Sequence, residues 1–173
     1  MKKIALGLMV VCLSSVAFGA YKTMHKKKQV KKTTSSVSSN NTNIKSIMMG
    51  RSACFGQCPS YTIEIFETGM LRYTGKSHTK MTGTYEKNIG AEKVGKFIAE
   101  FNSIRPDTLH YMYEKRVADL PGIYYFIAYP DSVKRVMNAD EGPELLREWA
   151  IKIDSFAKVD QSWKKVEDGN QKK

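Results

Sequence analysis

Cys54 and Cys58 have the residue type and spacing best suited to covalent chemistry in this sequence, with Phe-Gly-Gln between them. A disulfide needs Cα atoms about 4.4–6.8 Å apart, so a loop this short must fold sharply. Gly56 supplies the backbone freedom for that fold. Pro59 fixes its own φ and favours an extended conformation at Cys58. The spacing therefore predicts a structural disulfide that makes the entry to the next strand rigid.

Three other uses of the two cysteines stay open at this point. A thiol–disulfide redox protein usually carries Cys-x-x-Cys beside a βαβ unit, and neither feature is found in this sequence. A structural zinc site needs four ligands, and only His78 and His110 follow the first 43 residues as histidine partners. The third alternative is a pair of free thiols.

Signatures of catalysis and cofactor binding are missing from the sequence. It has no glycine-rich phosphate loop, no His-Glu-x-x-His motif and no carboxylate cluster at metal-ligand spacing. A hydrolase around His78 or His110 is the weakest alternative, because a general base needs a nucleophile within reach. We therefore expect no catalytic residues, no metal site and no cofactor, and we favour a protein that is not an enzyme.

The first 19 residues have the pattern of an export signal. A charged start, Met1–Lys3, precedes the mainly apolar run Ile4–Phe18, and small residues at Ala17 and Gly19 fit a cleavage site after Gly19. Export to the periplasm or the medium would favour the disulfide, because those compartments are oxidising. The alternative is an uncleaved anchor in the inner membrane, although the run is short for a span of about 20 residues.

The net charge of +11 belongs mostly to the N-terminal part of the chain. Residues 1–43 hold eight lysines and no acidic residue. Residues 20–43 are rich in Lys, Ser, Thr and Asn, a composition that predicts a disordered linker. The linker is either a spacer or an electrostatic contact to an anionic surface. Residues 44–160 hold 16 basic and 15 acidic residues, so we expect no nucleic-acid partner.

The elements that must position the cysteine loop follow from apolar periodicity. Segments that alternate with period two, or that are apolar and bounded by turn residues, predict strands. The expected strands are Ile44–Gly50, Tyr61–Phe66, Met70–Thr74, Met81–Glu86, Gly122–Tyr129 and Ser132–Met137.

Two segments show helical spacing instead. Apolar residues from Val94 to Ile104 recur at helical spacing, and Pro106 blocks continuation. A second helix opens at Gly142-Pro143, with an apolar stripe at Leu145, Leu146, Trp149, Ile153 and Phe156. We predict an α+β domain over residues 44–160, with an antiparallel meander sheet of about five to six strands and both helices packed on one face. Residues 161–173 are expected to form a polar tail.

The irregular stretch 108–121 is the best surface candidate for an interaction. Tyr111, Tyr113 and Arg116 are the residues to test, because tyrosine and arginine are enriched at interfaces. In the alternative interpretation the stretch is a connector whose aromatic residues close one end of the core.

The pattern Cys-Phe-Gly-x-Cys-Pro-x-Tyr at Cys54–Tyr61, followed by Gly69 and Tyr73-x-Gly75, resembles an uncharacterised family of exported bacterial proteins, the domain-of-unknown-function family number 6438. The resemblance runs from about Ile44 to Val159. It implies an exported domain and carries no catalytic residue. Together with the sequence, it predicts a non-enzymatic module that binds an envelope protein or polymer; the alternatives are a redox protein that uses Cys54 and Cys58 or, more remotely, a hydrolase.

Overall fold

The computed structural model of the protein describes residues 44–114 and 120–166. The predicted signal peptide (1–19) and linker (20–43) lie outside the described residues, as does Arg116. Among the residues that are described, no helix is both long enough and apolar enough to cross a membrane.

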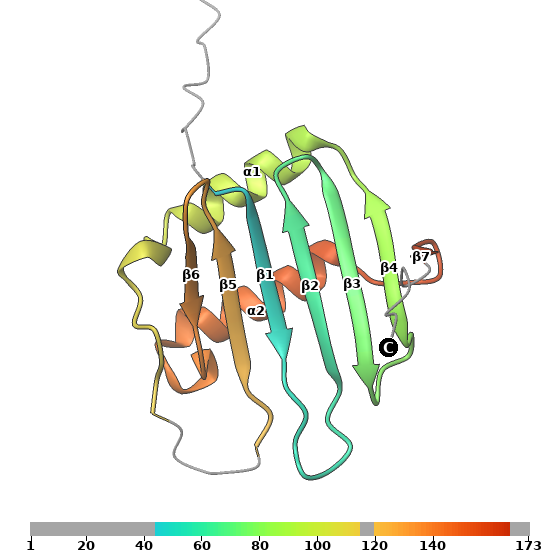
Figure 1. The fold of residues 1–173 in the computed structure, drawn as a ribbon, viewed down its shortest axis with the longest axis horizontal. Coiled ribbons are helices and arrows are strands. Elements are labelled where there is room, and N and C mark those ends of the chain that lie inside the picture. The colour runs from blue at the N-terminus through green and yellow to red at the C-terminus, as the bar shows by residue number, and fades with distance from the viewer. Residues whose placement is uncertain (1–43, 115–119, 167–173) are drawn as a thin grey trace, which may run out of the picture. The chain divides into compact units, whose positions relative to one another are not determined.

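One antiparallel sheet of seven strands forms the framework, in the order β6-β5-β1-β2-β3-β4-β7 (Figure 1). The strands β1 to β4 follow one another as a meander, and the β5–β6 hairpin adds to the free side of β1. The bounds are β1 (Ser46–Arg51), β2 (Ser60–Phe66), β3 (Met70–Ser77), β4 (Gly83–Asn88), β5 (Ile123–Ala128), β6 (Val133–Val136) and β7 (Lys164–Val166). The predicted α+β class and antiparallel sheet are confirmed, with one strand more than the upper expected number.

The additional strand lies in the segment that we predicted to be a polar tail. β7 pairs with β4, and Trp163 just before it is buried, with its ring 6.5 Å from that of Tyr73. The sheet therefore extends to Val166, past the boundary that we predicted at residue 160. We did not predict this strand because two of its three residues are lysines, so the sequence shows no alternation of apolar residues there.

Both helices pack on the same face of the sheet, as predicted (Figure 1). They are α1 (Ala91–Asn102) and α2 (Glu144–Ala157), and two short 3-10 turns, η1 (Pro106–Thr108) and η2 (Ala139–Glu141), precede β5 and α2. Trp149 of α2 packs edge-on against Phe97 and Phe101 of α1, with ring centroids 5.6 and 5.0 Å apart. Leu145, which we placed in the apolar stripe of α2, is 40 % exposed and lies outside the core.

The strand alternation separates a buried apolar face from an opposite face that mixes charged and aromatic side chains. Ile47, Met49, Ile63 and Leu71 are fully buried under the helices. The opposite face carries charged neighbours on adjacent strands: Glu64 pairs in register with Arg72 and Arg72 with Glu86. The core accordingly lies in a single layer between the sheet and the two helices.

Three connections meet at one end of the sheet: the Cys54–Cys58 loop between β1 and β2, the turn at residues 78–82 between β3 and β4, and the entry to β5 (Figure 1). We call this the disulfide end. In Figure 1, α1 crosses the strands near their opposite end and α2 crosses nearer the middle, so the strands at the disulfide end extend beyond both helices.

Candidate binding site at the disulfide end

The Cys54–Cys58 disulfide closes the loop between β1 and β2, as the spacing predicts. The two Cα atoms are 5.5 Å apart, and the Gly56 amide donates a hydrogen bond to Cys54 Sγ at 3.2 Å. Phe55, at the outer turn of this loop, is 95 % exposed. The loop therefore holds a large apolar side chain in solvent on a covalently closed backbone.

A polar cluster of Arg51, Tyr61 and Asp154 lies next to the loop. Arg51 ends β1, Tyr61 begins β2, and Asp154 comes from the second half of α2. The Tyr61 hydroxyl donates to Asp154 Oδ1 at 2.7 Å, and Arg51 Nη2 donates to Asp154 Oδ2 at 2.8 Å. Arg51 Nε also donates to the Tyr61 oxygen at 2.9 Å. Each member thus contacts the other two, and the cluster joins α2 to the edge of the core.

Burial and hydrogen bonding shift the pKa values of Tyr61 and Arg51 further from neutrality. Burial, together with the hydrogen bond to Asp154, raises the pKa of Tyr61 to about 12, against the opposing effect of Arg51. Burial disfavours the charged guanidinium of Arg51, but the hydrogen bond to Asp154 and the attraction of its neighbours raise the pKa of Arg51 overall. At neutral pH the cluster therefore holds an ion pair and an uncharged phenol.

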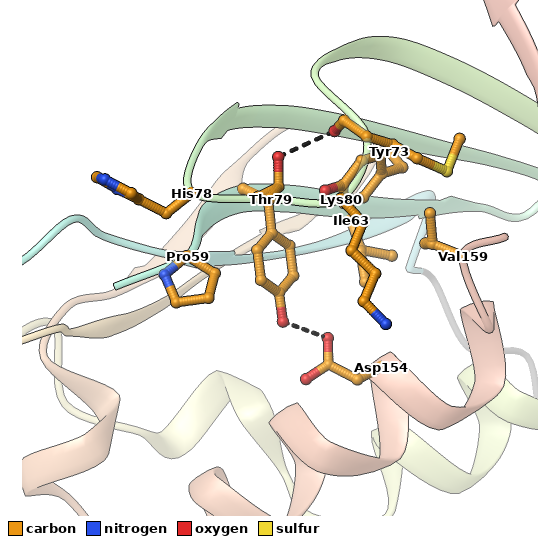
Figure 2. A pocket seen from close by; sticks show the side chains of 10 residues that line it. Pro59, Ile63, Tyr73, His78, Thr79, Lys80, Asp154 and Val159 are labelled. Atoms are coloured by element: carbon orange, nitrogen blue, oxygen red, sulfur yellow. Dashed lines mark hydrogen bonds between the residues drawn. The ribbon is translucent and has the colours of Figure 1, made fainter. Parts of the chain in front are cut away.

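An open hollow of about 490 Å³ lies on the β3 side of the cluster (Figure 2). We call it the tyrosine hollow, because Tyr61 and Tyr73 contribute aromatic rings to its wall. Their ring centroids are 5.7 Å apart with an interplanar angle of 39°. The other lining residues are Pro59, Ile63, His78, Thr79, Lys80, Met81, Asp154 and Val159.

A second hollow of about 560 Å³ lies on the β5 side of the cluster, and Pro59, Tyr61 and Asp154 line both. Asp140 lines the second hollow, where its Oδ1 accepts a hydrogen bond from the Ile123 amide at 2.8 Å. The Asp140 side chain therefore caps the start of β5. Pro59 follows the disulfide directly, so the closed loop fixes the position of a residue that lines both hollows.

The two histidines considered for catalysis lie on different segments. His78 is exposed in the β3–β4 turn with φ 53° and lines the tyrosine hollow. His110 is exposed in the irregular stretch, with its ring 5.7 Å from that of Tyr113. Within the described ranges 44–114 and 120–166, no group of three or more histidine, cysteine or acidic side chains could hold a metal ion.

The predicted interaction residues Tyr111 and Tyr113 differ in their surroundings. Tyr111 is 57 % exposed and lines a groove beside β6. Tyr113 is partly buried against the core, and its amide donates to the Met137 carbonyl at 3.1 Å. Tyr111 is therefore available to a partner, whereas Tyr113 fits the alternative of a connector that closes the core. Arg116 lies outside the described residues.

The cluster was not among the residues predicted to form a site, but the sequence contains one signal for it. Arg51 and Tyr61 fall at the inward-facing positions of their strands, in step with Met49 and Ile63. A charged residue at such a position needs a buried partner. The partner, Asp154, is 103 residues from Arg51 in the sequence, and only the packing of α2 on the sheet brings the two together.

Comparison with protein families decides the classification. A model of the family described as Domain of unknown function (DUF6438) matches residues 45–157, more than half of the chain. The chain belongs to the DUF6438 family. The predicted family is therefore confirmed, and the DUF6438 match runs from β1 to the last residue of α2. A comparison with curated proteins found no match.

Proposed function

We propose that this DUF6438 chain is an exported domain of the bacterial envelope that binds an envelope protein or polymer and catalyses no reaction. The observation that carries the proposal is the surface around Pro59, where two open hollows meet beside a disulfide-closed loop that presents Phe55. Hollows of this size are in the range of ligand sites in proteins, roughly 300–1,000 Å³.

Phe55 provides an apolar anchor for a partner. It is 95 % exposed, whereas Ile151 on α2, the next most exposed large apolar residue among those that the structure describes, is 62 % exposed. Burying a phenylalanine side chain contributes about 1.5–3 kcal/mol. Because the disulfide already restricts the loop, little further conformational entropy is lost when the partner binds.

The N-terminal residues support the location and a second contact. The apolar run Ile4–Phe18 is an export signal in our proposal, and an oxidising compartment fits the disulfide. The lysine-rich residues 20–43 then provide electrostatic attraction to an anionic surface. Tyr111, Tyr113 and Arg116 are proposed as an additional contact, of which Tyr111 is the exposed member in the described part of the chain.

Binding is tested by co-sedimentation of the purified exported chain with isolated envelope fractions. We expect F55S to reduce the bound fraction by roughly fivefold or more. The matched control I151S also removes an exposed apolar side chain, but from α2, and should bind like the wild type. Equal retention of wild type and F55S on every fraction would contradict the proposed surface.

Export is tested by the intact mass of the protein recovered from its native cells. We expect a chain that lacks residues 1–19 and that takes up two alkyl groups only after reduction. A mass that includes residues 1–19 would support the anchored alternative. Alkylation of Cys54 and Cys58 without reduction would contradict an oxidising compartment.

A further inference from the structure

We propose that the tyrosine hollow binds a ring-shaped carboxylate, with the ring against the tyrosine side chains and the carboxylate paired with the Lys80 ammonium. This inference rests on the proposed binding function and adds the chemistry of the group that is bound. It follows from the apolar wall, from the charges that face the hollow and from the charge of the N-terminal residues.

The wall of the hollow is suited to the apolar face of a ring-sized group. The partly exposed ring of Tyr61 lies beside that of Tyr73, of which 5 % is exposed, and Pro59, Met81 and Val159 add apolar surface around them. An aromatic ligand ring would gain about 0.5–1.5 kcal/mol from pairing with these rings beyond the burial of apolar area, whereas the apolar face of a sugar ring would gain from burial alone. The rings are also held in place: Tyr61 by its hydrogen bond to Asp154, and Tyr73 by an edge-to-face contact with Trp163.

The acidic group that lines the hollow is already neutralised. Both oxygens of Asp154 accept hydrogen bonds, from Tyr61 and from Arg51, and Arg51 supplies the counter-charge at 2.8 Å. A cationic ligand would therefore compete with Arg51. Tyr61 is uncharged at neutral pH, as an ordinary phenol is, and burial raises its pKa further, to about 12.

Lys80 supplies the positive charge that is left. It is exposed, and within the ranges 44–114 and 120–166 no acidic side chain forms a salt bridge with it. Figure 2 shows its ammonium directed to the same side of the hollow as the Asp154 carboxylate, whereas His78 points away. The hollow thus offers an apolar wall with one available cation at its rim, which is complementary to an anion on an apolar ring.

The N-terminal residues favour the same sign of ligand charge. Residues 20–43, which stay on the exported chain in our proposal, hold six lysines and no acidic residue, so a negatively charged ligand would be attracted to the chain from a distance. Two sources supply a carboxylate on a ring: a free aromatic acid, or a sugar acid within an acidic polysaccharide. The experiment uses one probe for each source.

The test is a titration of the ¹⁵N-labelled exported chain by NMR with sodium benzoate and with sodium glucuronate. We expect at least one of them to shift the amide signals of Tyr61, Tyr73 and Thr79 in a saturable manner. The uncharged analogues benzamide and glucose should bind at least fivefold more weakly. Benzoate alone would assign the aromatic source and glucuronate alone the sugar source. If neither probe shifts these signals, or if the analogues bind equally, the inference is wrong.

Lysine variants test whether binding depends on the ammonium of Lys80 itself or on the positive charge of the surface in general. K80M should weaken binding of the carboxylate probe roughly fivefold, and K80R should retain most of it. K76M removes an exposed lysine from the same strand end but from the outward face, and should leave binding unchanged. Equal losses in K76M and K80M would contradict the assignment. F55S should still bind the probe, so that failure of the hollow and failure of the proposed function are distinguishable.

Discussion

The cluster of Arg51, Tyr61 and Asp154 shows how polar side chains occupy positions that the strand alternation assigns to the core. Each of them is only partly buried, with 27 % of the Arg51 side chain and 31 % of the Asp154 side chain exposed. The ion pair therefore remains in contact with solvent, and its contribution to stability is modest. Its main effect is geometric, because it fixes the Tyr61 ring between the two hollows.

The pH dependence of stability tests this cluster through Tyr61→Phe. The raised pKa favours the protonated phenol in the folded state, so this stabilisation is complete below pH 10, the ordinary pKa, and is lost as the pH rises through about 12. At pH 8 we expect Y61F to be less stable by about 1–2 kcal/mol, because it lacks the hydroxyl bonds. The difference should shrink between pH 10 and 12. Urea unfolding of both proteins across this range measures it, and a constant difference would refute the pKa assignment.

At the scale of elements, the disulfide loop stabilises a local conformation. A closed loop of five residues contributes about 2 kcal/mol in the chain-entropy description. We expect the C54S/C58S double variant to lose about this amount and to keep its sheet, with faster amide exchange confined to the loop and to Pro59–Tyr61. Thermal unfolding and hydrogen exchange measure both effects. Loss of the entire fold would contradict a local role.

The turn that carries Lys80 depends on a close approach between β3 and the following residues. A Cβ at Gly75 would lie 1.9 Å from the Met81 carbonyl oxygen. G75A should therefore destabilise the protein by about 1–3 kcal/mol and displace the 78–82 turn. G95A is the matched control, because a Cβ on the exposed side of α1 meets nothing within 4 Å; it should stabilise by about 0.5–1 kcal/mol. Chemical denaturation gives both values, and equal effects would contradict this packing.

The same elements show what could be predicted from the sequence. Regular spacing of apolar residues, as in Ile63–Ile65 of β2 and Val94–Phe101 of α1, predicted the main strands and both helices. The cysteine spacing predicted the disulfide. The prediction missed β7, whose lysines have no apolar period and whose place in the sheet depends on Trp163 packing against Tyr73. It also missed the cluster, because the partner of Arg51 is set by how α2 crosses the sheet rather than by local sequence.

At the scale of the whole domain, α1 and α2 cover most of one sheet face and leave the disulfide end uncovered (Figure 1). The core supports the fold, while the disulfide loop, the 78–82 turn and the entry to β5 form a surface with two hollows and one exposed aromatic residue. This separation is typical of binding domains, in which a rigid framework presents variable loops. On the opposite sheet face, Arg72 and Arg135 lie over the rings of Phe66 and Phe126, whereas at the disulfide end the ring of Phe55 is almost fully exposed.

The most direct test of this account is photo-crosslinking in the cells that produce the protein, with benzoylphenylalanine in place of Phe55 and, as a control, in place of Ile151. Both positions are exposed and apolar, so the two variants differ in location rather than in chemistry. The account predicts a discrete crosslinked envelope species from position 55 and none from position 151. Crosslinks from position 151 alone, or the same species from both positions, would contradict binding at the disulfide end.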